Sequence, residues 1–182
     1  MAAAALIGVG ILAVLVFLLL GVVAELFRDV RQMRDALGIL DRPQPVAIGD
    51  AAGAPPSRFG LPAELDDEPS ALVMFLSDRC ATCRVLAATM GGALPAGLWI
   101  VVEAASERSA ADFVRDYRLE HAAGEGRVII DREGSIAARL ELTLSPVAYR
   151  VEEGVFRDAA TVPSVRYLVS ILPEPGAAPV GA

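Results

Sequence analysis

The chain has 182 residues, enough for one ordinary domain with a buried core and some additional segments. All 16 basic residues are arginine, and 23 acidic residues outnumber them, giving a formal net charge of −7. This balance excludes a basic nucleic-acid-binding face, and we expect no nucleic acid among the partners.

The N-terminal segment is apolar, with no charged side chain from Met1 to Ala24. A helix of this length, at about 1.5 Å per residue, crosses a hydrocarbon core of about 30 Å. A cleaved signal peptide is the main alternative. Against it, no basic residue precedes the apolar run, and Glu25–Arg28 is a poor small-residue cleavage site. The sequence therefore predicts a retained single-pass membrane anchor over residues 1–27, in contact with lipid.

The segment after the anchor, residues 28–58, is predicted to combine an amphipathic helix with a linker. Apolar residues recur three and four positions apart, which is typical of one helix face: Leu26, Val30, Met33, Leu37 and Leu40. This face could lie on the membrane, on its own domain or on a partner helix. Pro43 and Pro45 end the helix, and the composition of residues 51–58 (AAGAPPSR) is typical of a linker. A domain over 59–172 and a disordered tail over 173–182 complete the predicted organisation.

Within this domain, predicted strands and helices alternate before a final hairpin and helix. The order of elements predicts an α/β fold in which a mixed central sheet has helices on both faces, the architecture of the thioredoxin fold. The expected elements are a strand (72–76), a helix (80–90), a strand (98–103), a helix (109–119), a strand (127–131), a short helical segment before 142, a hairpin (147–151 and 155–162) and a last helix (165–172).

The two cysteines of the chain, Cys80 and Cys83, form a CxxC pair. Two cysteines placed at random in a chain of this length would show this spacing roughly once in ninety cases. The pair falls where a predicted strand ends and a helix begins, so Cys80 is expected at the exposed helix N-terminus and Cys83 one turn inside. The helix dipole favours a thiolate at Cys80, to which Arg79 and Arg84 add positive potential, whereas Asp78 opposes it.

Such a pair predicts thiol–disulfide exchange, in which the Cys80 thiolate attacks and Cys83 resolves the mixed disulfide. Zinc normally needs four ligands, and the only histidine, His121, is distant in the sequence. Haem attachment needs a histidine after the second cysteine, where Arg84 stands. We therefore expect no metal and no cofactor, while a purely structural pair remains an alternative. Glu103, at the end of a predicted strand, is expected near the rim of the site.

The segments LVMFLSDRCATCRVL, Leu98–Glu103 and RVIIDREGSIAARLELTLSPVAYRVEEGVFR resemble the thioredoxin superfamily, and within it the membrane-anchored TlpA-like and MauD-like branch. The resemblance spans about residues 59–172. It implies that Pro146 is cis and lies against the cysteines, and that Ser145 offers backbone hydrogen bonds to a substrate strand.

Three features depart from the family pattern. Arg79 replaces the aromatic residue that often precedes the first cysteine, and Met74 replaces the buried acid that many thioredoxins place six positions before it. The dipeptide Ala81-Thr82 matches no well-known reductase or oxidase. The direction of electron flow therefore stays open.

The arginines after the anchor and the family resemblance predict opposite orientations in the membrane. Arg28, Arg31 and Arg34 follow the anchor, and the positive-inside rule then places the domain in the cytoplasm. TlpA-like and MauD-like proteins are held with this domain outside the cytoplasmic membrane, where disulfides persist, and we follow the resemblance.

Two functional hypotheses follow from the sequence. The leading one is a membrane-tethered thiol–disulfide oxidoreductase that acts on the thiols or disulfides of exported or membrane client proteins, together with a membrane redox partner. The alternative is a non-catalytic accessory subunit of a larger membrane complex, with a thioredoxin-like docking domain.

Overall fold

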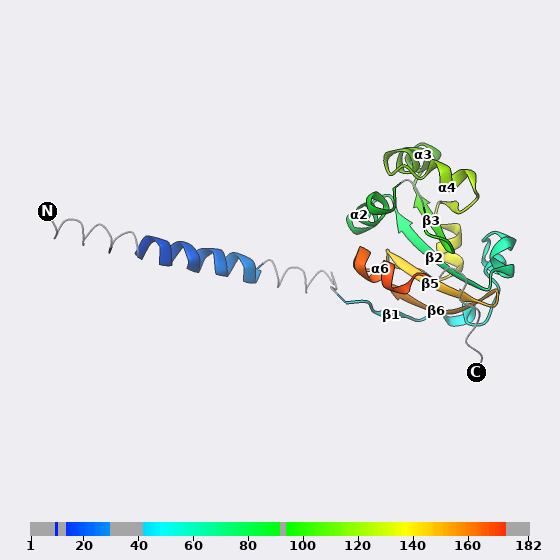
Figure 1. Ribbon diagram of the computed structural model, residues 1–182, viewed down its shortest axis with the longest axis horizontal. Helices are drawn as coiled ribbons and strands as arrows, with labels where there is room; N and C mark the ends of the chain where they lie inside the picture. Colours follow the sequence, from blue (N-terminus) through cyan, green and yellow to red (C-terminus); the bar gives the residue numbers. More distant parts are fainter. Residues whose placement is uncertain (1–9, 11–13, 30–41, 92–93, 174–182) are drawn as a thin grey trace. The chain divides into compact units, whose positions relative to one another are not determined.

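The computed structural model describes residues 10, 14–29, 42–91 and 94–173 (Figure 1). The chain divides into two units, Met1–Leu40 and Asp41–Ala182. In the first unit, residues 14–29 are helical and carry exposed apolar side chains such as Phe17 and Leu19. Among the described residues, no helix combines the length and the apolar character that crossing a membrane requires. Residues 1–9, 11–13 and 30–41 lie outside the described part, as does the predicted tail from 174 onward, so the anchor and the amphipathic helix stay predictions.

The second unit is built on one six-stranded sheet with the order β1-β6-β5-β2-β3-β4. The central strands β2, β3 and β4 pair in parallel, whereas β5, β6 and β1 pair antiparallel. The strand bounds are β1 (Pro45–Val46), β2 (Ser70–Ser77), β3 (Leu98–Ala104), β4 (Val128–Arg132), β5 (Val147–Glu152) and β6 (Val155–Thr161).

Strand β2 is buried on both faces, as a strand covered by two layers requires. Successive side chains point to opposite faces, so Met74 lies in one apolar cluster and Phe75 in the other. Trp99 on β3 is buried, as expected for a core residue. The continuous apolar run that predicted this strand therefore serves two separate cores.

Helices cover both faces of the sheet (Figure 1). The first apolar cluster, around Met74, contains buried residues from α2, α3 and α6, and the second, around Phe75, contains residues from α5. The helix bounds are α2 (Ala81–Met90), α3 (Glu107–Asp116), α4 (Glu120–Gly124), α5 (Ser135–Arg139) and α6 (Val165–Ile171). A mixed sheet with helices on both faces is the predicted α/β architecture, and the order of its elements fits a thioredoxin-like fold.

The domain begins earlier than the sequence pattern indicates, near Asp41 rather than near Phe59. Strand β1 pairs with β6, and three 3-10 helices follow: η1 (Gly49–Ala51), η2 (Pro56–Phe59) and η3 (Ala63–Asp67). The Gly53 N–H donates to the Phe156 carbonyl at 2.8 Å, and the Phe156 N–H donates to the Ala54 carbonyl at 3.0 Å. Residues 51–58 are therefore packed against β6 instead of forming a free linker, because their small side chains allow the two backbones to approach.

Asp131 is the one buried charged residue among those the structure describes. Its Oδ1 accepts from the Ser135 hydroxyl at 3.1 Å and from the Ile136 N–H at 2.9 Å, and its Oδ2 accepts from the Ala137 N–H at 2.9 Å. These bonds satisfy donors at the start of α5 that have no partner within the helix. Asp131 thus anchors α5 to the end of β4, which sets the start of the loop that leads to Ser145.

The Tyr149 hydroxyl is the one fully buried side-chain polar atom without a hydrogen-bond partner in the described part of the chain. Its ring packs edge-on against Phe75 and Phe156, with centroid distances of 5.5 and 4.9 Å. Burial raises the pKa of the phenol from 10.0 to about 12. The unfolded chain thus loses this proton first. Ionisation of Tyr149 therefore has no effect on stability below pH 10.0 and lowers the free energy of unfolding as the pH rises from 10.0 to about 12.

We expect Tyr149→Phe to raise the free energy of unfolding by about 1 kcal/mol at neutral pH, because a desolvated hydroxyl is removed while the ring packing stays. The variant should also lose less stability than the parent between pH 10 and 12. Urea denaturation with reductant present measures both effects. Tyr167→Phe, on the partly exposed face of α6, is the matched control. A clear loss of stability in Tyr149→Phe at neutral pH would show that the hydroxyl is bonded.

Candidate active site

Strand pairing brings the cysteines and the Ser145-Pro146 segment to one place. Strand β2 ends at Ser77, and a turn closed by the Cys80 N–H on the Ser77 carbonyl at 3.1 Å leads into α2. In the antiparallel pair of β2 and β5, Phe75 lies opposite Val147. Ser145 and Pro146 precede Val147 and therefore fall beside the end of β2, where the turn to Cys80 begins.

Cys80 is the N-cap residue of α2 and is partly exposed. Its Sγ accepts a hydrogen bond from the Cys83 N–H at 3.2 Å, and as a thiol it donates to the Ser145 carbonyl at 3.6 Å. A sulfur at this position lies at the positive end of the helix dipole and receives a free backbone N–H. The arrangement holds the Cys80 sulfur at the helix start, partly exposed and beside the Ser145 carbonyl.

Cys83 is chemically different because it is fully buried in the first apolar cluster, together with Leu86, Ala87 and Met90. Burial raises the pKa of its thiol from 9.0 to about 12, and the hydrogen bond with Cys80 adds to the shift. Hydrogen bonds with the Ser77 backbone and the Ser145 side chain act in the opposite direction. Cys83 is thus the protonated, shielded member of the pair at neutral pH.

Charged side chains flank Cys80 on the exposed side. The Arg84 guanidinium donates to the Arg79 carbonyl at 3.4 Å, which holds its charge at the start of α2. The Asp78 carboxylate accepts from the Ala105 N–H at 3.5 Å and lies 3.9 Å from Arg79 Nε. The acid next to the pair is therefore engaged by the β3–α3 connection and by a cation.

The peptide bond between Ser145 and Pro146 is cis, as the family resemblance implied. The Pro146 carbonyl accepts from the Val162 N–H at 3.0 Å, which ties this loop to the end of β6. The Ser145 carbonyl faces Cys80, and the Ser145 N–H is left without a hydrogen-bond partner among the described residues.

Met74 occupies β2 with no exposed surface and belongs to the same apolar cluster as Cys83. The buried charge of the described part of the chain, Asp131, is fully used at the start of α5. Within the described ranges, Cys83 therefore has no buried carboxylate available as a proton acceptor. The described residues also contain no group of three histidine, cysteine or acidic side chains arranged to hold a metal ion.

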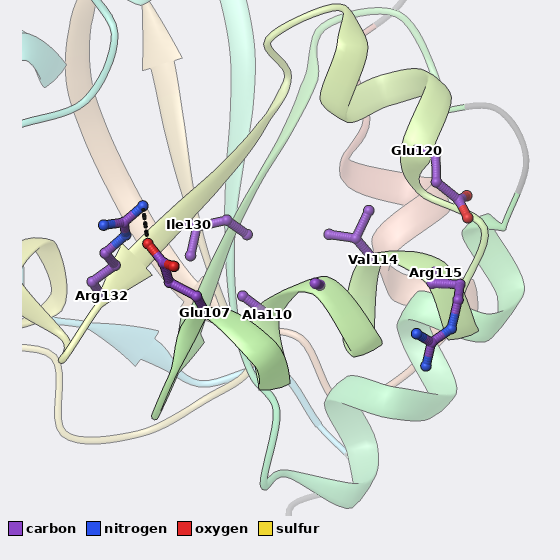
Figure 2. A pocket seen from close by; sticks show the side chains of 8 residues that line it. Glu107, Ala110, Val114, Arg115, Glu120, Ile130 and Arg132 are labelled. Atoms are coloured by element: carbon purple, nitrogen blue, oxygen red, sulfur yellow. Dashed lines mark ion pairs between the residues drawn. The ribbon is translucent and has the colours of Figure 1, made fainter.

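Hollows of about 340, 300 and 190 Å³ lie on the domain surface, and of these only the smallest is lined by a residue of the cis-proline loop. Figure 2 shows the hollow of about 340 Å³, where the apolar side chains of Ala110, Val114 and Ile130 lie between α3 and β4 and an ion pair joins Glu107 to Arg132 at 2.8 Å. Its lining contains neither cysteine. The smallest hollow is lined by Ser145 and by Glu103.

Glu103 lies at the rim of the site, where sequence reasoning expected it, at the carboxyl end of β3. Apart from Ser145, the other residues of this smallest hollow were not anticipated as site residues. Thr143 and Leu144 come from the loop before β5, and Ala137 comes from α5. The only feature of the sequence that could have indicated Thr143 and Leu144 is their position just before Ser145-Pro146. Their place in one hollow with Glu103 depends on how the chain returns from α5 to the sheet.

The comparisons with known proteins give similarity in fold. No family model matches the chain, and no curated protein matches its sequence. Similar solved structures include a secreted Mycobacterium tuberculosis disulfide oxidoreductase homologous to E. coli DsbE (20% identity, 50% of this chain and 67% of that chain, TM-score 0.39). Others are the thioredoxin domain of a Bacteroides vulgatus thiol-disulfide oxidoreductase (15%, 63% and 88%, 0.40) and a Corynebacterium glutamicum thiol-disulfide isomerase (15%, 75% and 100%, 0.41). At such identities the likeness concerns fold alone, so function is inferred from the geometry of the cysteine pair.

The inequality of the two thiols predicts selective alkylation. In the folded, reduced protein at pH 8, iodoacetamide should modify Cys80 and leave Cys83 unmodified, because Cys83 is buried and stays protonated to about pH 12. Peptide mass mapping measures the label at each position. Denaturation in urea is the control and should expose both thiols. Equal labelling of the two in the folded protein would contradict the described geometry.

Proposed function

We propose that this chain is a membrane-tethered thiol–disulfide oxidoreductase that acts on client proteins through Cys80 and Cys83. One observation carries the proposal: Cys80 caps α2 with its sulfur hydrogen-bonded to the Cys83 N–H and placed next to the Ser145 carbonyl, while Cys83 is buried one turn away. A structural pair would not need one thiol at the surface and aimed at an open loop.

In the reducing direction, the Cys80 thiolate attacks one sulfur of a client disulfide. A bond forms between Cys80 and that sulfur, and the second client sulfur leaves as a thiolate that takes a proton. Cys83 then loses its proton and attacks Cys80 Sγ, which releases the first client sulfur as a thiolate that also takes a proton from solvent. The protein ends with a Cys80–Cys83 disulfide, and the client has gained two electrons together with two protons, equal in number to those that the two cysteine thiols released. The opposite direction reverses each step, and the reduction potential of the pair decides between them.

The resolving step is the slower one in this site, because the Cys83 thiol must lose its proton inside an apolar cluster. Many thioredoxins place a buried acid nearby, whereas this chain has Met74. Once Cys80 is part of a mixed disulfide, it no longer shares its hydrogen bond with Cys83, but the burial that contributes most to the raised pKa remains. A long-lived mixed disulfide suits an enzyme that handles a few specific clients better than a general reductant.

Ser145 and Pro146 are proposed to bind an extended client segment. The Ser145 carbonyl lies 3.6 Å from Cys80 Sγ, so a client strand that pairs with Ser145 holds its own sulfur close to the attacking one. The Ser145 N–H, which lacks a partner among the described residues, is available to a client carbonyl. The buried Pro146 fixes this edge of the loop and offers no N–H of its own.

Membrane tethering is proposed from the uncharged apolar run at the N-terminus, which is long enough to cross a hydrocarbon core. Such a tether favours clients that are exported or embedded in the membrane, with a membrane redox partner or a larger membrane complex nearby. We place the thioredoxin-like domain outside the cytoplasm, where disulfides persist.

Cys80→Ser should abolish exchange with a model disulfide, because the attacking sulfur is removed. Cys83→Ser is the matched variant: it should still attack but accumulate the mixed disulfide at Cys80. Stopped-flow exchange and mass spectrometry of the trapped species measure these outcomes. If Cys80→Ser exchanged as fast as the parent, the redox role would fail and the accessory-subunit hypothesis would gain.

The proposed orientation predicts where a C-terminal reporter is active. A phosphatase that folds only where disulfides form, fused after Leu172, should be active, and a reporter that requires the cytoplasm should be silent at the same junction. Removing residues 1–27 is the control and should reverse the pattern. If the reporter that requires the cytoplasm were active in the full chain, the orientation predicted from the arginines after the anchor would be correct and the proposed placement would be wrong.

A further inference from the structure

The hollow beside Ser145 points to the kind of client that this site selects. We propose that it accepts a lysine or arginine side chain of the client, close in sequence to the client cysteine, and that Glu103 recognises its positive charge. This inference rests on the proposed function, since it concerns the polypeptide that Cys80 attacks.

Position links the hollow to the chemistry. Ser145 lines the hollow, and its carbonyl also lies 3.6 Å from Cys80 Sγ. An extended chain advances about 3.3 Å per residue, so a client residue one or two positions from the attacked cysteine spans the distance from one side of Ser145 to the other. The side chain of that client residue can therefore occupy the hollow while the client sulfur reacts with Cys80.

Size indicates a single side chain. The hollow measures about 190 Å³. Sites for small molecules and cofactors usually measure about 300 to 1,000 Å³, so this one is small for a free metabolite. It is lined by three segments: the end of β2, the end of β3 and the chain from α5 to Ser145. One long side chain, inserted from the client strand, suits such a space.

The lining matches a side chain with an aliphatic stem and a cationic head. Ala137, Leu142 and Leu144 supply apolar surface, and Leu144 is half exposed although it is a large hydrophobic residue. The Thr143 and Ser145 segment adds polar groups, and Glu103 adds the one carboxylate of the lining. Lysine and arginine lie along apolar surface through their methylene groups while the charged end reaches a polar partner.

The Glu103 carboxylate has no ion-pair partner within 4.0 Å among the described residues. It lies beside the turn at Gly134, where an added Cβ would be in ordinary contact with Glu103 Oε1 at 3.5 Å. The φ of +71° at Gly134 disfavours a larger residue at this turn. Arg132, on the adjacent strand, is paired with Glu107 at 2.8 Å. The carboxylate is therefore available to a cation from outside.

The test compares disulfide-linked peptides that differ at one position. The full chain in detergent micelles, reduced beforehand, is mixed at low ionic strength with short peptides that carry arginine, glutamine or glutamate one or two residues before or after the cysteine. The second-order rate of exchange is measured for each. For at least one position, we expect the arginine peptide to react about two- to five-fold faster than the glutamine peptide, as for a partly exposed ion pair.

Variants separate local recognition from net charge. Glu103→Gln should bring the arginine-to-glutamine rate ratio close to one, and Glu103→Lys should favour the glutamate peptide. Glu64→Gln, which removes the same charge from the exposed surface of η3 before β2, should keep the parental ratio. Raising the salt concentration should shrink the parental ratio, because an ion pair at the surface is screened.

Each outcome has a distinct meaning. A ratio near one at every peptide position in the parent, or a ratio that Glu103→Gln leaves unchanged, would overturn the inference while exchange itself supports the proposed function. Absence of exchange with the small neutral disulfide bis(2-hydroxyethyl) disulfide in the parent would instead overturn the proposed function. An equal loss of the ratio in Glu103→Gln and Glu64→Gln would assign the preference to overall charge and count against the hollow.

Discussion

The pairing of β2 with strands of opposite direction on its two sides is the constraint on which the site depends. Its parallel partner β3 requires a crossover, and α2 supplies it, which puts a helix start directly after Ser77. Its antiparallel partner β5 begins at Val147 opposite Phe75, which brings Ser145 back to the same end. A shift of this register by one residue would turn Phe75 and its neighbours to the opposite face of the sheet. Core packing therefore fixes the place where the reactive sulfur meets the cis-proline loop.

The same constraint makes the two thiols unequal. Because α2 packs on the sheet through the face that contains Cys83, Leu86 and Met90, the sulfur one turn earlier is left at the helix start and the edge of the core. Burial disfavours the charged form of Cys83, whereas Cys80 stays partly exposed and its sulfur accepts a backbone N–H at the helix start. Reactivity is thus assigned by the packing of a helix. No charged side chain in the core is needed to make the two thiols differ. This agrees with the uncharged Met74 in the same apolar cluster as Cys83 and with the buried carboxylate of the described residues, Asp131, which is hydrogen-bonded to α5.

The sequence predicted the central elements well because their signals are local. The apolar run of β2 and the turn residues between β5 and β6 each indicate one structure, and the cysteine spacing marks a helix start. Residues 51–58 were misread because alanine, glycine and proline are equally typical of a linker and of a segment packed closely on a neighbouring backbone. Helix α4 was also missed, since the helical pattern that begins near Ser109 breaks at Arg118, whose φ of +56° no sequence pattern announces. The hollow beside Ser145 was beyond prediction, because it arises between residues about forty positions apart.

In the proposed enzyme, reactivity and recognition come from different parts of the chain. The turn from Ser77 to Cys83 and the start of α2 set the state of the sulfurs, whereas Glu103 and the loop from α5 to Ser145 form the surface beside them. Arg79 and Arg84 carry the charges near the first part, together with the Asp78 carboxylate beside Arg79, and Glu103 is the carboxylate of the second. Substitutions in the α5–β5 loop can then change which clients bind without altering the helix start that activates Cys80.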